Sequence, residues 1–166
     1  MHRVLAALGR CWRRACPDEA AGDRLLALLV GLAAVLALLP GLDGELVVDD
    51  HPIIEKGTVV RSGDPLLALR SAYWDGTKVH NRTVYRPLTI LSLLAGWQLW
   101  GDNAPAFRAT GIVLHALVAV LLFALLRCAT ARQLGVGRGA AAWAALLFAV
   151  HPIHVEAVLS AVNRSE

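Results

Sequence analysis

The chain has 166 residues, of which 57% are hydrophobic and 17% are charged. Soluble domains contain roughly 45–50% apolar and about 25% charged residues, so this composition excludes an ordinary soluble domain and is typical of a membrane protein. The formal net charge of +3 comes mainly from arginines beside an apolar segment, and not from a basic face with interleaved aromatic residues, which argues against a nucleic-acid partner. Three cysteines without a CxxC pair predict neither a disulfide framework nor a zinc site.

Residues 25–42 are predicted to form the first transmembrane helix, preceded by a basic arm at residues 1–24. Such a helix needs about 20 mainly apolar residues. A cleaved signal peptide is the alternative, but the arginine-rich arm and the missing A-x-A site before Asp43 favour a retained signal anchor. Because Lys and Arg are enriched on cytoplasmic flanks, we place the arm in the cytoplasm and residues 43–108 outside it, in a lumen or periplasm.

The acidic pair Asp49-Asp50 opens this outer loop. Carboxylates close to a bilayer cost free energy unless they pair, stay solvated or take part in chemistry. One of the two can act as a general base, or the pair can hold Mg²⁺ or Mn²⁺ through its oxygen atoms. A solvated acidic flank is the alternative that requires no function.

A helix is predicted over residues 88–100, with Pro87 as a plausible first helical residue and Gly101 after its end. The segment is uncharged but too short to span a bilayer, and Trp97 and Trp100 suit the headgroup zone. We therefore expect a helix parallel to the membrane surface, or alternatively a buried core helix of a larger bundle.

Two further features belong to the outer loop. Asp64 is a candidate cap for a second short helix that extends toward Trp74. Arg86 lies directly before the longer helix, where a guanidinium can hold a phosphate by forked hydrogen bonds. An arginine that merely reaches the membrane interface is the alternative.

Residues 109–126 are predicted to form the second transmembrane helix, followed by a cytoplasmic turn at 127–138 and a third helix at 139–150. The third helix would cover only about 18 Å, so it is expected to start earlier, near residue 134, or to continue past Pro152 as a kinked helix. His115 lies within the second span, and we expect it to bond to another helix.

Residues 151–166 are predicted to emerge on the same side as Asp49 and Asp50, so the two regions should converge. His151 and His154 are one helical turn apart and could meet one metal ion. Hydrogen bonds to phosphate, carbonyl or carboxylate groups are the more common role for histidines at such a position.

Together these motifs resemble the N-terminal part of the TMTC-type proteins, which are membrane O-mannosyltransferases that carry tetratricopeptide repeats and belong to the GT-C glycosyltransferase class. The resemblance covers residues 25–166. The segments that carry it are Val48-Asp49-Asp50, Tyr85-Arg86-Pro87-Leu88-Thr89, Leu114-His115-Ala116 and Leu147-Phe148-Ala149-Val150-His151-Pro152-Ile153-His154-Val155-Glu156-Ala157-Val158.

The resemblance implies an all-α polytopic membrane protein with about three transmembrane helices and one or two membrane-parallel helices, part of a larger GT-C bundle. It implies transfer of a sugar, mannose for this family, from a polyprenyl- or dolichyl-phosphate donor to a protein Ser/Thr hydroxyl, in the endoplasmic reticulum or a bacterial inner membrane. Asp49 or Asp50 becomes the catalytic base. The donor phosphate would be held by Arg86, His151, His154 and Arg164.

Two departures from the family qualify this interpretation. Relatives tend to read Gly-Arg-Ala-Glu where this chain reads Asn163-Arg164-Ser165-Glu166, so close backbone packing is not expected there. The family also needs many more spans, so we expect a polypeptide of these residues alone to be inactive. A non-catalytic membrane anchor or scaffold module is the alternative function.

Overall fold

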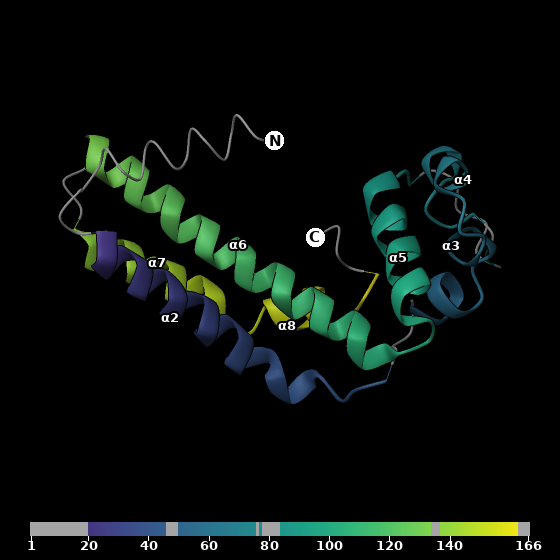
Figure 1. Ribbon diagram of the computed structural model, residues 1–166, viewed down its shortest axis with the longest axis horizontal. Helices are drawn as coiled ribbons and strands as arrows, with labels where there is room; N and C mark the ends of the chain where they lie inside the picture. The colour runs from purple at the N-terminus through teal and green to yellow at the C-terminus, as the bar shows by residue number, and fades with distance from the viewer. Residues whose placement is uncertain (1–19, 46–49, 76, 78–83, 134–136, 163–166) are drawn as a thin grey trace. The chain divides into compact units, whose positions relative to one another are not determined.

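The computed structural model describes residues 20–45, 50–75, 77, 84–133 and 137–162, which form helices joined by turns with no strand among them (Figure 1). The chain divides into two compact units. The first comprises residues 1–39 and 113–152, and the second comprises residues 40–112 and 153–166. The predicted all-helical fold is thus confirmed for the described residues.

Two helices among the described residues are long and apolar enough to cross a membrane, over Ala21–Gly41 and Ala104–Cys128. Helix α7 (Arg138–Val150) has 13 residues, about 20 Å of helix, which is less than a full span. The expectation of about three transmembrane helices is therefore supported for two of them, and the third predicted span corresponds to a shorter apolar helix.

The first unit packs helix α2 (Ala20–Leu38) against α7 and against the part of α6 (Ala104–Gln133) that follows residue 112. Helices α2 and α7 lie side by side (Figure 1). Their shared core consists mostly of small side chains, which let helix backbones approach closely. The buried residues are Val30, Ala34, Ala119, Phe123, Ala141, Ala142, Ala145 and Ala149.

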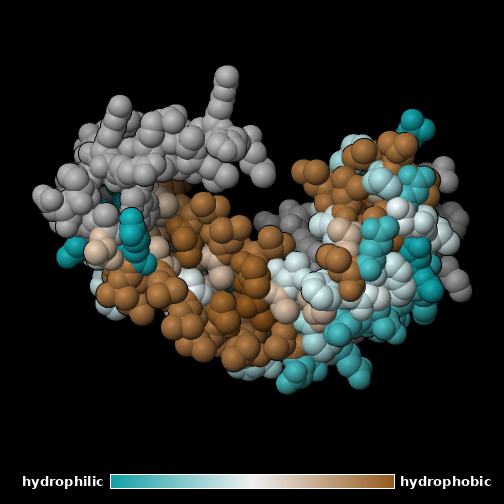
Figure 2. Space-filling view, in the orientation of Figure 1, coloured by the Kyte–Doolittle hydropathy of each residue, from teal (hydrophilic) through white to brown (hydrophobic). Residues whose placement is uncertain are grey.

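The outward faces of these helices are apolar. Figure 2 shows hydrophobic residues over the visible face of α2 and α6. Only 17% of the apolar window in α2 and 28% of that in α6 is buried. The core helix of a soluble protein would be mostly buried, so this exposure suits contact with lipid. Exposed leucines on α2 are Leu25, Leu28, Leu29, Leu32 and Leu36.

Helix α6 starts five residues before the predicted residue 109 and continues to Gln133. Its start has a local cause, because the Asn103 side-chain oxygen accepts a hydrogen bond from the Ala106 N–H at 3.1 Å. Pro105 lies in the first turn, where its missing N–H is tolerated. The uncharged run used for the prediction thus captured only the middle of a longer helix.

The second unit contains α5 (Pro87–Trp100) and several short helices, namely the π-helical turn η3 (His51–Glu55), α3 (Thr58–Arg61), α4 (Pro65–Arg70) and α8 (His154–Leu159). The 3₁₀ turn η2 (Leu39–Gly41) extends into it from the end of α2. Both α3 and α4 pack on α5. The buried core comprises Ile53, Ile54, Val59, Val60, Ala68, Tyr73, Ile90, Leu93, Leu94, Phe107, Ala161 and Val162.

Local signals set the ends of α4 and α5. The predicted cap is confirmed, since Asp64 Oδ1 accepts a hydrogen bond from the Leu66 N–H at 2.8 Å. Helix α4 ends at Arg70, earlier than predicted, because Ser71 is extended. Helix α5 begins at Pro87, and Gly101 follows it with a φ of 62° while its N–H donates to the Trp97 carbonyl at 2.8 Å. Glycine is the residue that adopts this conformation most readily.

An ion pair is buried between two helices of the first unit. Arg127 was expected in a cytoplasmic turn, but it lies within α6, and its Nη2 is 3.1 Å from Asp23 Oδ2 in α2. The Arg127 Nε also donates to Asp23 Oδ1 at 3.2 Å. Side-chain exposure is 8% for Arg127 and 7% for Asp23, so neither charge has free access to water.

We expect Arg127→Met to lower the free energy of unfolding of this chain by about 3–5 kcal/mol, because it leaves Asp23 buried without its cation. The double variant Asp23→Leu/Arg127→Met should recover most of that loss, since it removes both charges. The measurement is a denaturation titration in detergent micelles. Equal losses in the single and double variants would contradict a role for the pair.

Candidate functional site around Asp50

Asp50 joins the segment that follows η2 to the segment that follows α8. Its side chain is fully buried, with an exposed fraction of 0%. Its Oδ1 accepts hydrogen bonds from the Val162 N–H at 3.0 Å and from the Ser160 hydroxyl at 3.3 Å. The convergence predicted for these two regions is therefore confirmed at Asp50. In this structure the carboxyl group anchors a backbone turn.

Tyr73 binds the backbone of the same residue, Val162, through its carbonyl group. The Tyr73 hydroxyl donates to the Val162 carbonyl at 2.8 Å, and the side chain is buried. The Tyr73 N–H donates to the Val84 carbonyl at 2.8 Å, two residues before Arg86. Asp50, Tyr73 and Val162, which we call the Val162 clamp, therefore connect three separate stretches of the chain.

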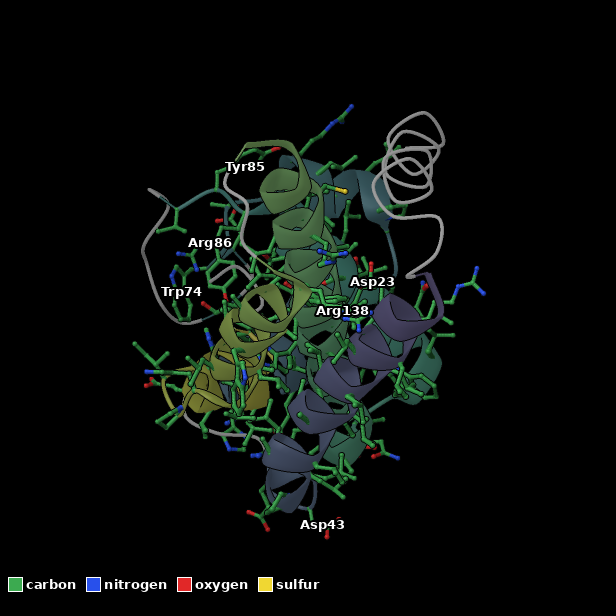
Figure 3. All side chains as sticks on the ribbon, turned by 90° about the vertical axis from the view of Figure 1, so that its left-hand side faces the viewer. Asp23, Asp43, Trp74, Tyr85, Arg86 and Arg138 are labelled. Atoms are coloured by element: carbon green, nitrogen blue, oxygen red, sulfur yellow. The ribbon has the colours of Figure 1, made fainter. Side chains whose placement is uncertain are left out.

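Arg86 packs on this clamp. Its guanidinium carbon lies 5.4 Å from the centroid of the Tyr73 ring, within the range of a cation–π interaction. The Tyr73 ring also contacts Trp74 edge-on, with the ring centroids 5.3 Å apart. The side chains of Trp74 and Arg86 are labelled in Figure 3. Arg86 is partly exposed, and the Tyr73 ring constrains the orientation of its side chain. An anion at this surface would meet a preorganised guanidinium.

The other predicted site residues differ in what the structure describes. Asp49 and Arg164 lie outside the described residues. His151 directly follows α7 and belongs to the first unit, whereas His154 is the first residue of α8 in the second unit. Asp49 is the neighbour of the anchored Asp50, and Arg164 follows the anchored Val162 by two positions.

A metal centre is one interpretation of the acidic pair and of His151 and His154. Among the described residues, no group of three or more His, Cys, Asp or Glu side chains is arranged to hold a metal ion. The Asp50 Oδ1 accepts hydrogen bonds from two protein donors, and Asp49 lies outside the described residues.

Arg108 was not singled out from the sequence, although it is a charged residue near the start of an apolar helix. It is 7% exposed. Its Nη1 donates to the Gly41 carbonyl at 2.9 Å, and its Nη2 donates to the Glu45 carbonyl. Its Nε is buried and has no hydrogen-bond partner within the described part of the chain. Arg108 thus holds the turn that leads from α2 toward the acidic pair.

His115 fulfils the expectation that it bonds to another helix. Its Nε2 lies 3.0 Å from the Ala149 carbonyl oxygen near the end of α7, and its ring stacks on Phe148 at 5.5 Å. The last carbonyls of a helix lack partners within that helix, and this contact supplies one. His115 therefore has a structural role in the first unit.

Helix α8 approaches the backbone of α6 at Gly111. A Cβ atom added at Gly111 would lie 2.3 Å from the Val158 carbonyl oxygen, which is closer than atoms can approach. Glycine is thus required for α8 to lie where Ser160 and Val162 reach Asp50.

We expect Gly111→Ala to destabilise the protein by about 1–3 kcal/mol, because a backbone carbonyl must move to admit the new methyl group. The matched control is Gly139→Ala in α7, where the added Cβ meets no described atom within 4 Å. That control should be neutral or slightly stabilising. Unfolding titrations of both variants in micelles test the difference, and equal stability would contradict the close approach.

Three relatives show what the chain is similar to. It is 38% identical over 158 residues to protein O-mannosyl-transferase TMTC1 of Homo sapiens, covering 93% of this chain and 17% of that protein. It is 32% identical over 151 residues to protein O-mannosyl-transferase TMTC4 of Homo sapiens, covering 84% of this chain and 20% of that protein. It is 28% identical over 148 residues to protein O-mannosyl-transferase F38B6.6 of Caenorhabditis elegans, covering 87% of this chain and 21% of that protein.

No family model and no solved structure matches the chain. The relatives confirm the resemblance to TMTC-type proteins that the motifs indicated. The chain spans about one fifth of the length of the curated relatives it matches.

Proposed function

We propose that this chain, a homologue of the TMTC-type protein O-mannosyl-transferases, forms part of a GT-C membrane glycosyltransferase that transfers mannose to protein Ser/Thr hydroxyls. The names of the relatives support mannose transfer to a protein acceptor. The apolar exteriors of α2 and α6 support a membrane location, for which we propose the endoplasmic reticulum with residues 1–24 in the cytoplasm. The observation that carries the proposal is the Val162 clamp, which ties Asp50 to the region of Arg86.

The reaction we propose begins from a polyprenyl- or dolichyl-phosphate mannose in the bilayer. The acceptor hydroxyl oxygen forms a bond to the anomeric carbon while the bond from that carbon to the phosphate oxygen breaks. The lipid phosphate leaves with the bonding electrons, and a carboxylate takes the hydroxyl proton. The protein needs a base near the acceptor and cations near the phosphate.

Within the acidic pair, we assign the base to Asp49 and the supporting role to Asp50. A base must come within about 2.6–3.2 Å of the proton donor. Asp50 is fully buried and accepts the Val162 N–H and the Ser160 hydroxyl. A side chain so enclosed is suited to fixing its neighbour in place. A divalent metal ion held by Asp49 and Asp50 is the other role proposed for the pair, and loss of mannose transfer on addition of a chelator to the assay described below would support it.

For the donor phosphate, we propose Arg86 as the principal cation, with Arg164, His151 and His154 as further contacts. Arg86 is partly exposed and supported by the Tyr73 ring. Arginine matches a phosphate with two parallel N–H donors, which fixes orientation as well as charge. Because the chain spans about one fifth of the length of its relatives, the activity of a complete enzyme is a proposal, as are the further spans and tetratricopeptide repeats that the family resemblance implies.

The test uses the complete polypeptide that contains these residues, expressed in membranes and assayed with dolichyl-phosphate mannose and a Ser/Thr peptide. We expect Asp49→Asn to reduce transfer by about 10²–10⁴-fold, because the proton acceptor is lost. The matched control is Asp43→Asn, an exposed acid earlier in the same outer region, which should retain normal transfer.

Membrane insertion and protein level should be unchanged in both variants, which separates chemistry from folding. Normal transfer by Asp49→Asn would contradict its role as the base. If no variant and no wild-type preparation transfers mannose, the non-catalytic anchor or scaffold function takes precedence.

A further inference from the structure

We infer that Tyr73 is a positioning residue that couples Arg86, the proposed donor-phosphate ligand, to Asp50. The inference rests on the proposed function, because it specifies how the Arg86 site is held. Tyr73 does not belong to any of the sequence motifs that indicated the site. Its importance comes from contacts that only the folded chain displays.

Three contacts fix the Tyr73 ring. The hydroxyl donates to the Val162 carbonyl at 2.8 Å, and the backbone N–H donates to the Val84 carbonyl at 2.8 Å. The ring also packs against Trp74 at 5.3 Å between centroids. With 5% of its surface exposed, the side chain has little freedom to move. Such a ring is a rigid support.

Arg86 uses the face of this support. A guanidinium over an aromatic face is attracted to the negative charge density of the ring, and the attraction strengthens when water is excluded. At 5.4 Å from the ring centroid, the Arg86 guanidinium lies within the range of this attraction. The ring thus constrains the orientation of the Arg86 side chain, and in the proposed function that side chain binds the donor phosphate.

The hydroxyl of Tyr73 connects the ring to the residue that binds Asp50. It binds the carbonyl of the same residue whose N–H binds Asp50. Displacement of Val162 would therefore disturb Asp50 and Tyr73 together. The acid side and the phosphate side of the proposed reaction share one backbone anchor.

Two substitutions separate the contact of the Tyr73 ring with Arg86 from the hydrogen bond of its hydroxyl to Val162. Tyr73→Phe keeps the ring face but removes the hydroxyl, so we expect a lower kcat with little change in the donor KM. Tyr73→Leu removes the face as well, and we expect donor affinity to weaken by about 3- to 30-fold. The matched control is Tyr85→Phe, whose hydroxyl donates to the Leu69 carbonyl at 2.5 Å outside the clamp.

The affinity measurement uses dolichyl monophosphate in lipid nanodiscs with the complete polypeptide, so it does not depend on transfer. If Tyr73 acts through Arg86, then Tyr73→Leu should weaken binding in the wild type but have little further effect in an Arg86→Ala background. Equal weakening in both backgrounds, or none in the wild type, would overturn the inference.

Failure of the proposed function gives a different result. In that case the wild-type protein would not bind dolichyl monophosphate at all. A loss of folded protein in Tyr73→Leu is checked by the Tyr73→Phe variant, which retains the ring volume. A wild-type kcat in Tyr73→Phe would also overturn the coupling through Val162.

Discussion

The second unit depends on one buried carboxyl group, because Asp50 has no access to water and must find its hydrogen-bond donors within the protein. Burying such a group without donors costs several kcal/mol. The Val162 N–H and the Ser160 hydroxyl supply them. Val162 lies 112 positions after Asp50 in the sequence. Folding of this unit therefore requires a specific long-range pairing. The pairing of Asp50 with Val162 limits the positions available to the short helices that lie between these two residues in the sequence.

The first unit satisfies a different constraint. Lipid offers no hydrogen bonds, so polar groups in a membrane-embedded region must be paired internally. Asp23 pairs with Arg127, and His115 bonds to the Ala149 carbonyl. The remaining contacts between helices come from alanines and a few larger apolar side chains. An apolar exterior with paired polar groups inside is the arrangement expected for lipid surroundings.

The sequence allowed the local features to be predicted, because they depend on neighbours within a few residues. The Asp64 cap and the ends of α5 at Pro87 and Gly101 follow from backbone chemistry. The contact between Asp50 and Val162 could be anticipated only as a convergence of regions. The identity of the bonded atoms depends on tertiary packing. Arg108 gave a signal, a charge in an apolar helix, but its carbonyl partners could not be deduced.

The choice of tyrosine at position 73 shows why the site could not be assigned from motifs alone. A phenylalanine would offer Arg86 the same ring face but no donor for the Val162 carbonyl. A serine or threonine would offer a donor but no face and no reach. Tyrosine combines a rigid aromatic surface with a hydroxyl at its far end, so one side chain serves a cation and a backbone anchor together. The functional assignment of this loop therefore depends on a residue that bears no charge and performs no chemistry itself.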